Sequence, residues 1–136
     1  MSTRRVSPGT GACPCGASAL LDTCCGPYLA GRARAPTAEA LMRSRYTAFA
    51  LANEPYLLAT WHASTRPPVL HLASGGATKW IGLEVKRAET TGSDTATVEF
   101  VARSKTGGRA QRLHEVSRFV REGAQWFYLN GNQPDA

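Results

Sequence analysis

The spacing of hydrophobic residues changes about halfway along the chain, and this change separates a helical part from a sheet-forming part. From Thr37 to Ala52 apolar side chains recur every three or four positions, which predicts the longest helix of the protein. Thr37 is a residue type that commonly caps a helix. A second helix is expected from Asn53 to about His62, because Asn suits the cap position and the following Glu-Pro pair suits a first turn.

From Lys79 onward hydrophobic and polar residues alternate, which is typical of β-strands with one covered face. Ile81, Leu83 and Val85, for example, share one predicted face. Turn signals separate the alternating segments, so we expect strands at about 79–86, 96–103, 112–122 and 125–129. Short connections make such strands antiparallel neighbours. Helices followed by a meander define an α+β fold, in which a curved sheet around the long helix forms a cone with an open mouth.

Arg45 interrupts the apolar face of the predicted long helix, where it lies between Leu41 and Phe49. Two interpretations are open. The stem of Arg45 packs against the core while its charged head reaches solvent. Alternatively, its guanidinium points into a pocket toward a carboxylate such as Glu115.

The third predicted strand is also mixed in character, because Glu115 and Ser117 share a face with Leu113 and Phe119. If this face lines the cone, its polar groups enter the interior near Arg45, where they must be hydrogen-bonded. The alternative is ordinary packing of an amphipathic sheet. Aromatic walls would be added by Trp126, Phe127 and Tyr128. The candidate pocket residues are Arg45, Tyr46, Glu115, Ser117 and Tyr128.

Composition limits the possible classes of protein. The chain has 136 residues, of which 43% are hydrophobic, so one main core is expected. No apolar run approaches the roughly 20 residues that cross a bilayer. The net charge of +6 comes mostly from scattered arginines that form no basic run. Arg4-Arg5 is followed by a polar, Pro- and Gly-containing stretch instead of an apolar segment, so we expect no signal peptide and a cytoplasmic location.

All four cysteines lie between Cys13 and Cys25, with the spacing C-x-C-x8-C-C. Four thiolates satisfy a tetrahedral Zn²⁺ ion, and a reducing cytoplasm disfavours the alternative of two disulfides. A redox thiol pair would normally read C-x-x-C. We expect Gly16 to form a turn that aims backbone N–H groups at the first two sulfurs. We further expect a short helix, capped by Ser18, from Ala19 to Cys25, with Gly26 just past its end and Pro27 stopping it.

Two stretches of this sequence resemble known families. Cys13-Pro14-Cys15-Gly16 with Cys24-Cys25-Gly26-Pro27-Tyr28-Leu29 resembles the SEC-C zinc motif. Residues 43–49 (RSRYTAF) and 114–120 (HEVSRFV) resemble the YchJ-like family of small bacterial proteins. That resemblance implies an N-terminal zinc knuckle, residues 1–30, and a cone-shaped domain like nuclear transport factor 2, residues 31–136. It implies zinc binding by Cys13, Cys15, Cys24 and Cys25, and it implies no reaction.

Three functions follow as hypotheses. The first is a zinc-containing adaptor that docks on a protein partner through the knuckle. The second is a small-molecule binding protein or enzyme that uses the cone, although the sequence shows no nucleophile–base–orienter set and no Gly-rich phosphate loop. The third, nucleic-acid binding, is disfavoured by the scattered arginines, and no membrane partner is expected.

Overall fold

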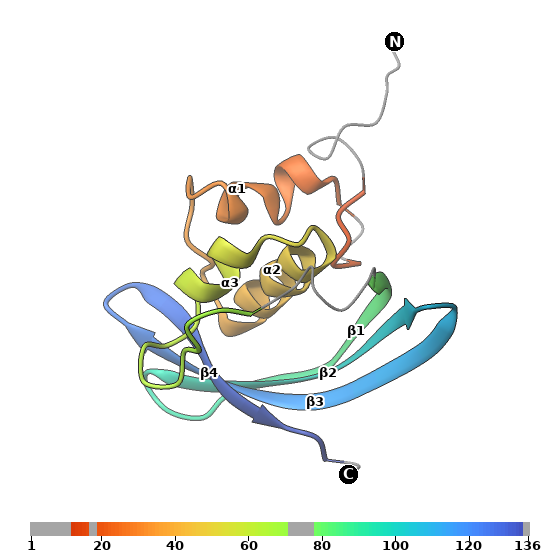
Figure 1. Cartoon of the computed structure of the whole chain (residues 1–136). Coiled ribbons are helices and arrows are strands. Elements are labelled where there is room, and N and C mark those ends of the chain that lie inside the picture. Colours follow the sequence, from red (N-terminus) through yellow and green to blue (C-terminus); the bar gives the residue numbers. More distant parts are fainter. Residues whose placement is uncertain (1–11, 17–18, 71–77, 135–136) are drawn as a thin grey trace.

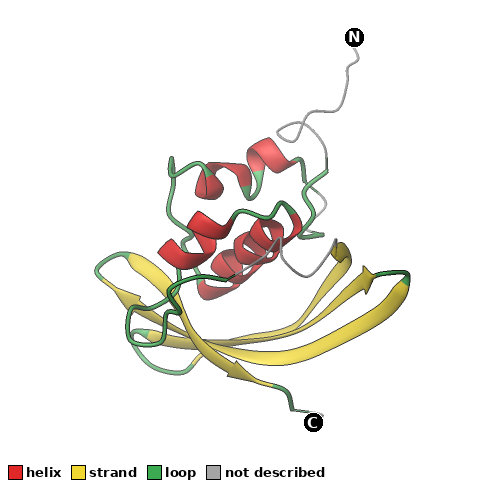
Figure 2. Ribbon diagram, viewed as in Figure 1, coloured by secondary structure: helices red, strands yellow, loops and turns green. Residues whose placement is uncertain are grey.

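The fold is built in layers, with a curved sheet below one long helix and shorter elements above that helix (Figure 1). The structure is a computed structural model that describes residues 12–16, 19–70 and 78–134, and it confirms the α+β class (Figure 2). Among these residues, no helix has both the length and the apolar character needed to cross a membrane. The elements in chain order are the 3₁₀ helix η1 (Leu21–Thr23), α1 (Gly26–Leu29), α2 (Ala38–Ala50), α3 (Glu54–Ala59), β1 (Thr78–Thr90), β2 (Thr95–Thr106), β3 (Arg109–Glu122) and β4 (Gln125–Asn132).

The two predicted helices begin where their caps place them. The Thr37 hydroxyl accepts a hydrogen bond from the N–H of Ala40 at 3.0 Å, and the Asn53 side chain accepts one from Tyr56 at 3.1 Å. The second helix ends at Ala59, earlier than the prediction of about His62. It stops there because the next residues pair with a strand instead of continuing the helix.

That pairing extends the edge of the sheet. The N–H of Tyr128 donates to the carbonyl of Thr60 at 2.8 Å, and the N–H of His62 donates to the carbonyl of Tyr128 at 2.7 Å. Trp61 thereby forms a parallel bridge with Tyr128. A segment that looked helical from its apolar spacing is therefore fixed as an extended chain beside β4.

The four strands form the predicted antiparallel meander in the order β1-β2-β3-β4. Each strand extends beyond its alternating segment, with β1 and β2 running to the hairpin turns. In the β2–β3 register Ala102 lies opposite Leu113 and Ala96 opposite Phe119, which places these side chains on the face that covers α2. The main core lies between this inner face and the helix, and it contains Leu41, Met42, Tyr46, Val98, Phe100 and Phe119.

Strand β1 departs from simple alternation at two register shifts, one between Trp80 and Gly82 and one between Val85 and Arg87. The first shift corrects the prediction that Ile81 shares a face with Leu83. Ile81 is exposed, whereas Trp80 and Leu83 both pack against the core. A β-bulge adds one residue to a strand, so the side chains on either side of it exchange faces.

The segment around the second cysteine pair also differs from its prediction. The expected helix from Ala19 to Cys25 is only the short η1, and the proposed Ser18 cap lies outside the described residues. Gly26 begins α1 instead of following a helix, and Pro27 occupies its first turn. Proline is as well suited to a helix start as to a stop, so the Gly-Pro pair alone does not distinguish the two.

Gly26 is required here for space and not for backbone freedom. A Cβ atom at this position would lie 2.6 Å from the backbone carbonyl oxygen of Leu21. We predict that Gly26→Ala lowers the free energy of unfolding by about 1–3 kcal/mol, measured by denaturant titration. Gly82→Ala is the matched control, because nothing lies within 4 Å of a Cβ there, and it should change stability by less than about 0.5 kcal/mol. Equal stability of the two variants would contradict the crowding.

Candidate metal centre and cone pocket

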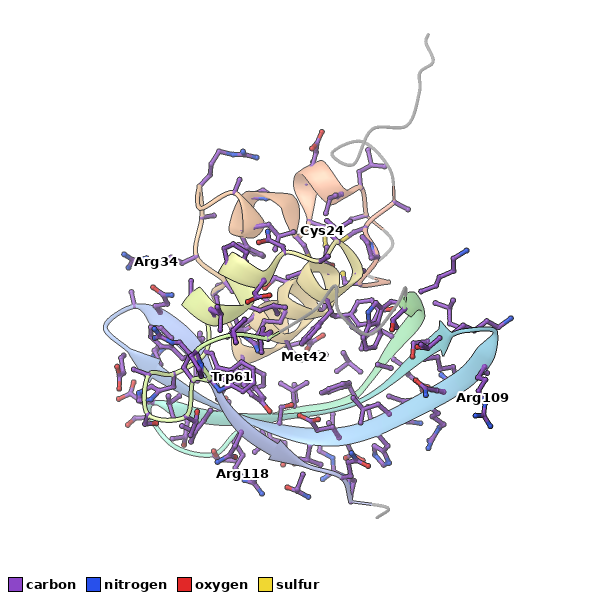
Figure 3. All side chains as sticks on the ribbon, in the orientation of Figure 1. Cys24, Arg34, Met42, Trp61, Arg109 and Arg118 are labelled. Carbon is purple, nitrogen blue, oxygen red and sulfur yellow. The ribbon has the colours of Figure 1, made fainter. Side chains whose placement is uncertain are left out.

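The four cysteines lie together above α2, on the side of that helix that faces away from the sheet. Figure 3 labels Cys24 there, and Met42 and Trp61 on the sheet side of the same helix. All four sulfurs lie within 4.8 Å of one another, and none is in a disulfide. The Sγ atoms of Cys15 and Cys24 are 3.6 Å apart, and those of Cys24 and Cys25 are 3.9 Å apart. Sulfurs bound tetrahedrally at about 2.3 Å from an ion lie about 3.8 Å apart, so the cluster fits a metal ion of this kind.

Local backbone structure brings the two cysteine pairs together. The N–H of Cys13 donates to the carbonyl of Ala19 at 2.8 Å, which closes a small hairpin around the first pair. Gly16 forms the predicted turn with a φ of 79°, a value that favours glycine. Its own N–H donates to the carbonyl of Cys13 at 3.3 Å. The second pair follows η1 and caps the start of α1.

The surroundings of the sulfurs favour neutral thiols when no cation is bound. Burial, followed by hydrogen bonding with Cys15, raises the pKa of Cys24 to about 12. The pKa of Cys25 is raised as well, chiefly by its hydrogen bond with Cys15 and then by burial. At pH 7 Cys24 and Cys25 therefore carry protons that a metal ion must displace, because thiolates are the binding form.

Helix α2 contacts the cluster through two side chains that the sequence analysis did not single out. The hydroxyl of Thr47, which is fully buried, lies 3.6 Å from the Sγ of Cys13. Arg43 donates from Nη1 to the carbonyl of Cys15 at 2.9 Å. Arg43 and Thr47 are four residues apart, so both project from one helix face, opposite the apolar stripe. The sequence offered this spacing and the membership of both residues in the 43–49 stretch, and neither indicates which partner lies opposite.

On its other side, α2 borders a cavity of about 270 Å³ that is also lined by residues of the sheet. The structure brings all five predicted pocket residues, Arg45, Tyr46, Glu115, Ser117 and Tyr128, to its walls. The remaining walls are mostly aromatic or aliphatic, and include Phe49, Trp61, Trp80, Phe100 and Phe119. Of the consecutive aromatics after residue 125 only Tyr128 lines this cavity, which corrects the expectation for Trp126 and Phe127. Whether these residues bind a ligand stays a prediction.

Arg45 is buried, with 6% of its surface exposed, so the interpretation in which its head reaches solvent is wrong. Its Nη1 donates to the carbonyl of Leu57 at 2.8 Å and to the hydroxyl of Thr60 at 2.7 Å. The guanidinium carbon lies 5.2 Å from the centre of the Trp61 ring and 4.7 Å from that of Tyr128, within the range of cation–π attraction. Burial lowers the pKa of Arg45 to about 10, so the group is charged at pH 7.

Glu115 is not the direct ion-pair partner that the sequence suggested for Arg45. Its Oε2 accepts a hydrogen bond from the Ser117 hydroxyl at 2.6 Å and a longer one from the Tyr128 hydroxyl at 3.5 Å. Within the described residues, no carboxylate lies at ion-pair distance from Arg45. Gly131 leaves room for this arrangement, because a Cβ there would collide with the Glu115 carboxylate. Burial, followed by the charge of Glu115, raises the pKa of Tyr128 to about 12, which keeps its hydroxyl a donor.

His62 forms part of a hydrogen-bonded row on the surface, outside the cavity. Its Nδ1 lies 2.7 Å from the Ser64 hydroxyl, and its Nε2 lies 2.7 Å from Oε2 of Glu122. The backbone N–H of Ser64 also points to Nδ1, at 3.1 Å, so the ring closes a local turn. These hydrogen bonds connect the segment that carries Trp61 to the end of β3.

A cysteine cluster of this spacing, attached to a cone of helices on a curved four-stranded sheet, defines a SEC-C motif protein with a domain like nuclear transport factor 2. The family model described as "YchJ, middle NTF2-like domain" matches residues 37–131. The chain belongs to the YchJ family, as its sequence resemblance implies. The match lies inside the predicted second domain, while the boundary at residue 30 stays a prediction.

Relatives and solved structures agree with this assignment. The chain is 60% identical over 124 residues to a UPF0225 protein of Chromobacterium violaceum, covering 88% of this chain and 91% of that one. A UPF0225 protein of Methylibium petroleiphilum is 57% identical, with 88% and 86% covered. The solution structure of a SEC-C motif protein from Rhodopseudomonas palustris matches with a TM-score of 0.81 at 35% identity, covering 89% and 97%. A crystal structure of a SEC-C motif protein from Psychrobacter arcticus matches with a TM-score of 0.77 at 30% identity, covering 90% and 82%.

The contact from α2 to the sulfurs generates a prediction about metal retention. Thr47→Val keeps the shape of the side chain but removes its hydroxyl, and outer-shell changes of this kind typically weaken metal binding about 10- to 100-fold. We expect weaker Zn²⁺ binding in competition with a chromophoric chelator. Thr97→Val, on β2 and distant from the cluster, is the control and should bind like the parent protein. Unchanged affinity in Thr47→Val would exclude the hydroxyl from the metal environment.

Proposed function

We propose that this protein binds a small molecule in the cone cavity and that a zinc ion held by its four cysteines braces the helix beside that cavity. The observation that carries the proposal is the buried guanidinium of Arg45, which lines the cavity without an ion-pair partner among the described residues. Burying a charge is costly unless it is paired. A ligand that fills the cavity and pairs with Arg45 would therefore offset that cost.

The character of the cavity supports the same proposal. Small-molecule sites are concave and mostly apolar, with a few polar groups that orient the ligand. Here aromatic walls surround the two charged side chains, Arg45 and Glu115. Both are held in place by hydrogen bonds to neighbouring groups, so the site is formed before any ligand arrives.

Zinc is the metal that the ligand set supports best, because four cysteine sulfurs at tetrahedral separations are typical of structural Zn²⁺ sites. A closed set of four thiolates supplies cross-linking and leaves no position for a reactive water. Cys13, Cys15, Cys24 and Cys25 would hold the ion, while Arg43 and Thr47 tie its surroundings to α2. A cytoplasmic location belongs to this proposal, since thiols stay reduced there.

The adaptor role stays a separate prediction. A protein partner would have to dock on the outer surface of the knuckle, since three of the four sulfurs are buried. Nothing in the described structure favours one partner over another. The geometry adds no observation in favour of nucleic-acid binding.

The metal part of the proposal predicts one zinc ion per chain in freshly purified protein, measured by elemental analysis. Cys24→Ser replaces the half-buried thiolate and should lose most of the zinc and lower the melting temperature. Asp22→Asn alters an exposed residue of the same segment and should retain the ion. Full zinc content in Cys24→Ser would contradict a site built from four thiolates.

The cavity part predicts that a small neutral aromatic probe enters the cone. We expect benzyl alcohol to shift the NMR signals of the Trp61 and Trp80 indoles, both of which line the cavity. Ala102→Leu adds bulk at the cavity wall and should weaken this binding. Ala110→Leu places the same bulk at an exposed position of β3 and should not. Shifts that are equal in all three proteins would place the probe elsewhere.

A further inference from the structure

One edge of the Arg45 guanidinium donates no hydrogen bond to the described residues, and its geometry indicates the class of ligand. Both hydrogen bonds that Arg45 donates come from Nη1, to the Leu57 carbonyl and the Thr60 hydroxyl. Within the part of the chain that the structure describes, Nε and Nη2 donate to no protein group. These two nitrogens form one side of the planar fork, and that side matches the two oxygens of a carboxylate.

Two aromatic rings lie together on one side of the guanidinium, and the Nε–Nη2 edge is the part of Arg45 that is left to a ligand. Trp61 and Tyr128 approach it within 5.2 and 4.7 Å, and their rings pack edge to face at 5.0 Å. Thr60 and Leu57 fix the opposite corner through Nη1. The group therefore has a single orientation in the pocket before any ligand is present, which lowers the entropy lost on binding.

Glu115 sets a second condition on the ligand. Its Oε2 is engaged by the hydroxyls of Ser117 and Tyr128, whereas Oε1 accepts no hydrogen bond from the described residues. A ligand carboxylate is repelled by this group and attracted by Arg45, so Arg45 is its preferred contact. A hydroxyl or ammonium group on the ligand is favoured beside Glu115, where it can donate a hydrogen bond to Oε1.

We propose that the ligand is a small aromatic or aliphatic carboxylic acid that also carries a hydrogen-bond donor, with its carboxylate on the Nε–Nη2 edge of Arg45 and its donor on Glu115. This inference rests on the proposed function, because it requires the cone cavity to be a binding site. The apolar body of such a ligand would contact the walls formed by Phe49, Trp80, Phe100 and Phe119.

Three matched probes test this assignment by isothermal titration at pH 7. 4-Hydroxyphenylacetate carries both groups, 4-hydroxyphenylethanol lacks the carboxylate, and phenylacetate lacks the donor. We expect 4-hydroxyphenylacetate to bind at least tenfold more tightly than either of the others. Comparable affinity for all three would overturn the assignment.

Two variants locate the groups that recognise the probes. Arg45→Lys keeps the positive charge but removes the fork, and it should reduce the affinity for 4-hydroxyphenylacetate at least tenfold while leaving 4-hydroxyphenylethanol unchanged. Glu115→Gln should reduce the preference for the hydroxylated acid over phenylacetate. Arg118→Lys, on the outer face of the sheet where Arg118 bonds Asn130 and Asn132, is the matched control (Figure 3). Thermal unfolding of each variant checks that it is folded.

The outcomes separate this inference from the proposed function. If benzyl alcohol binds and Ala102→Leu blocks it, but Arg45→Lys changes no affinity, the cavity is a binding site and the ligand class is wrong. If neither benzyl alcohol nor any of the three acids and alcohols binds, the proposed function fails and this inference with it. If the carboxylate probes bind and lose affinity in Arg45→Lys but not in Arg118→Lys, and Glu115→Gln lowers the preference for 4-hydroxyphenylacetate over phenylacetate, both stand.

Discussion

The arrangement of this protein depends on helix α2 being covered on two opposite sides. The sheet packs on one side and the cysteine cluster on the other, and Ser44, Thr47 and Ala48 are fully buried between them. A helix that is buried on two sides cannot leave the polar side chains on those sides unsatisfied. The hydroxyl of Ser44 accordingly bonds the carbonyl of Leu41 and the hydroxyl of Tyr56, which links α2 to α3. The buried polar residues of α2 therefore require hydrogen-bonding groups on the elements that pack against it.

Because α2 is buried on two sides, its residues contact both the cysteine cluster and the cavity. Thr47 and Arg43 point toward the sulfurs, while Arg45 and Phe49 project to the cavity side. Residues two apart on a helix face nearly opposite directions, so one short sequence serves both sites. The cysteine-bearing segment thus covers helix surface that would otherwise face water, and a metal ion would hold that cover in place.

Much of the fold could be predicted from the sequence because its signals are local. The caps at Thr37 and Asn53, the antiparallel meander and the cysteine cluster each depend on residues close together in the chain. The bulge beside Ile81 could not be predicted, since alternation continues through it in the sequence while the pairing partner decides the register. The start of α1 was missed for a similar reason, because Gly-Pro can end one helix or begin another.

For the pocket, the sequence predicted residues that line it but not the groups that these residues contact. The polar residues that line the cavity were found because they interrupt apolar patterns, as Arg45 and Glu115 do. Their partners were not found, because the Leu57 carbonyl lies near the end of α3 and the Thr60 hydroxyl lies where the chain leaves that helix to pair with β4. Sequence patterns identify which side chains are buried, while tertiary pairing determines which atoms they meet.

The two edges of the sheet differ in how they are covered, and this difference affects the tendency of the protein to aggregate. The edge at β4 is partly covered by the residues around Trp61, whereas the outer edge of β1 has no neighbouring strand among the described residues. Along β1 the two register shifts distort the ladder, and charged side chains such as Lys86 and Arg87 are exposed. A bent and charged edge is a poor template for a strand from another molecule, so these irregularities protect the protein from edge-to-edge aggregation.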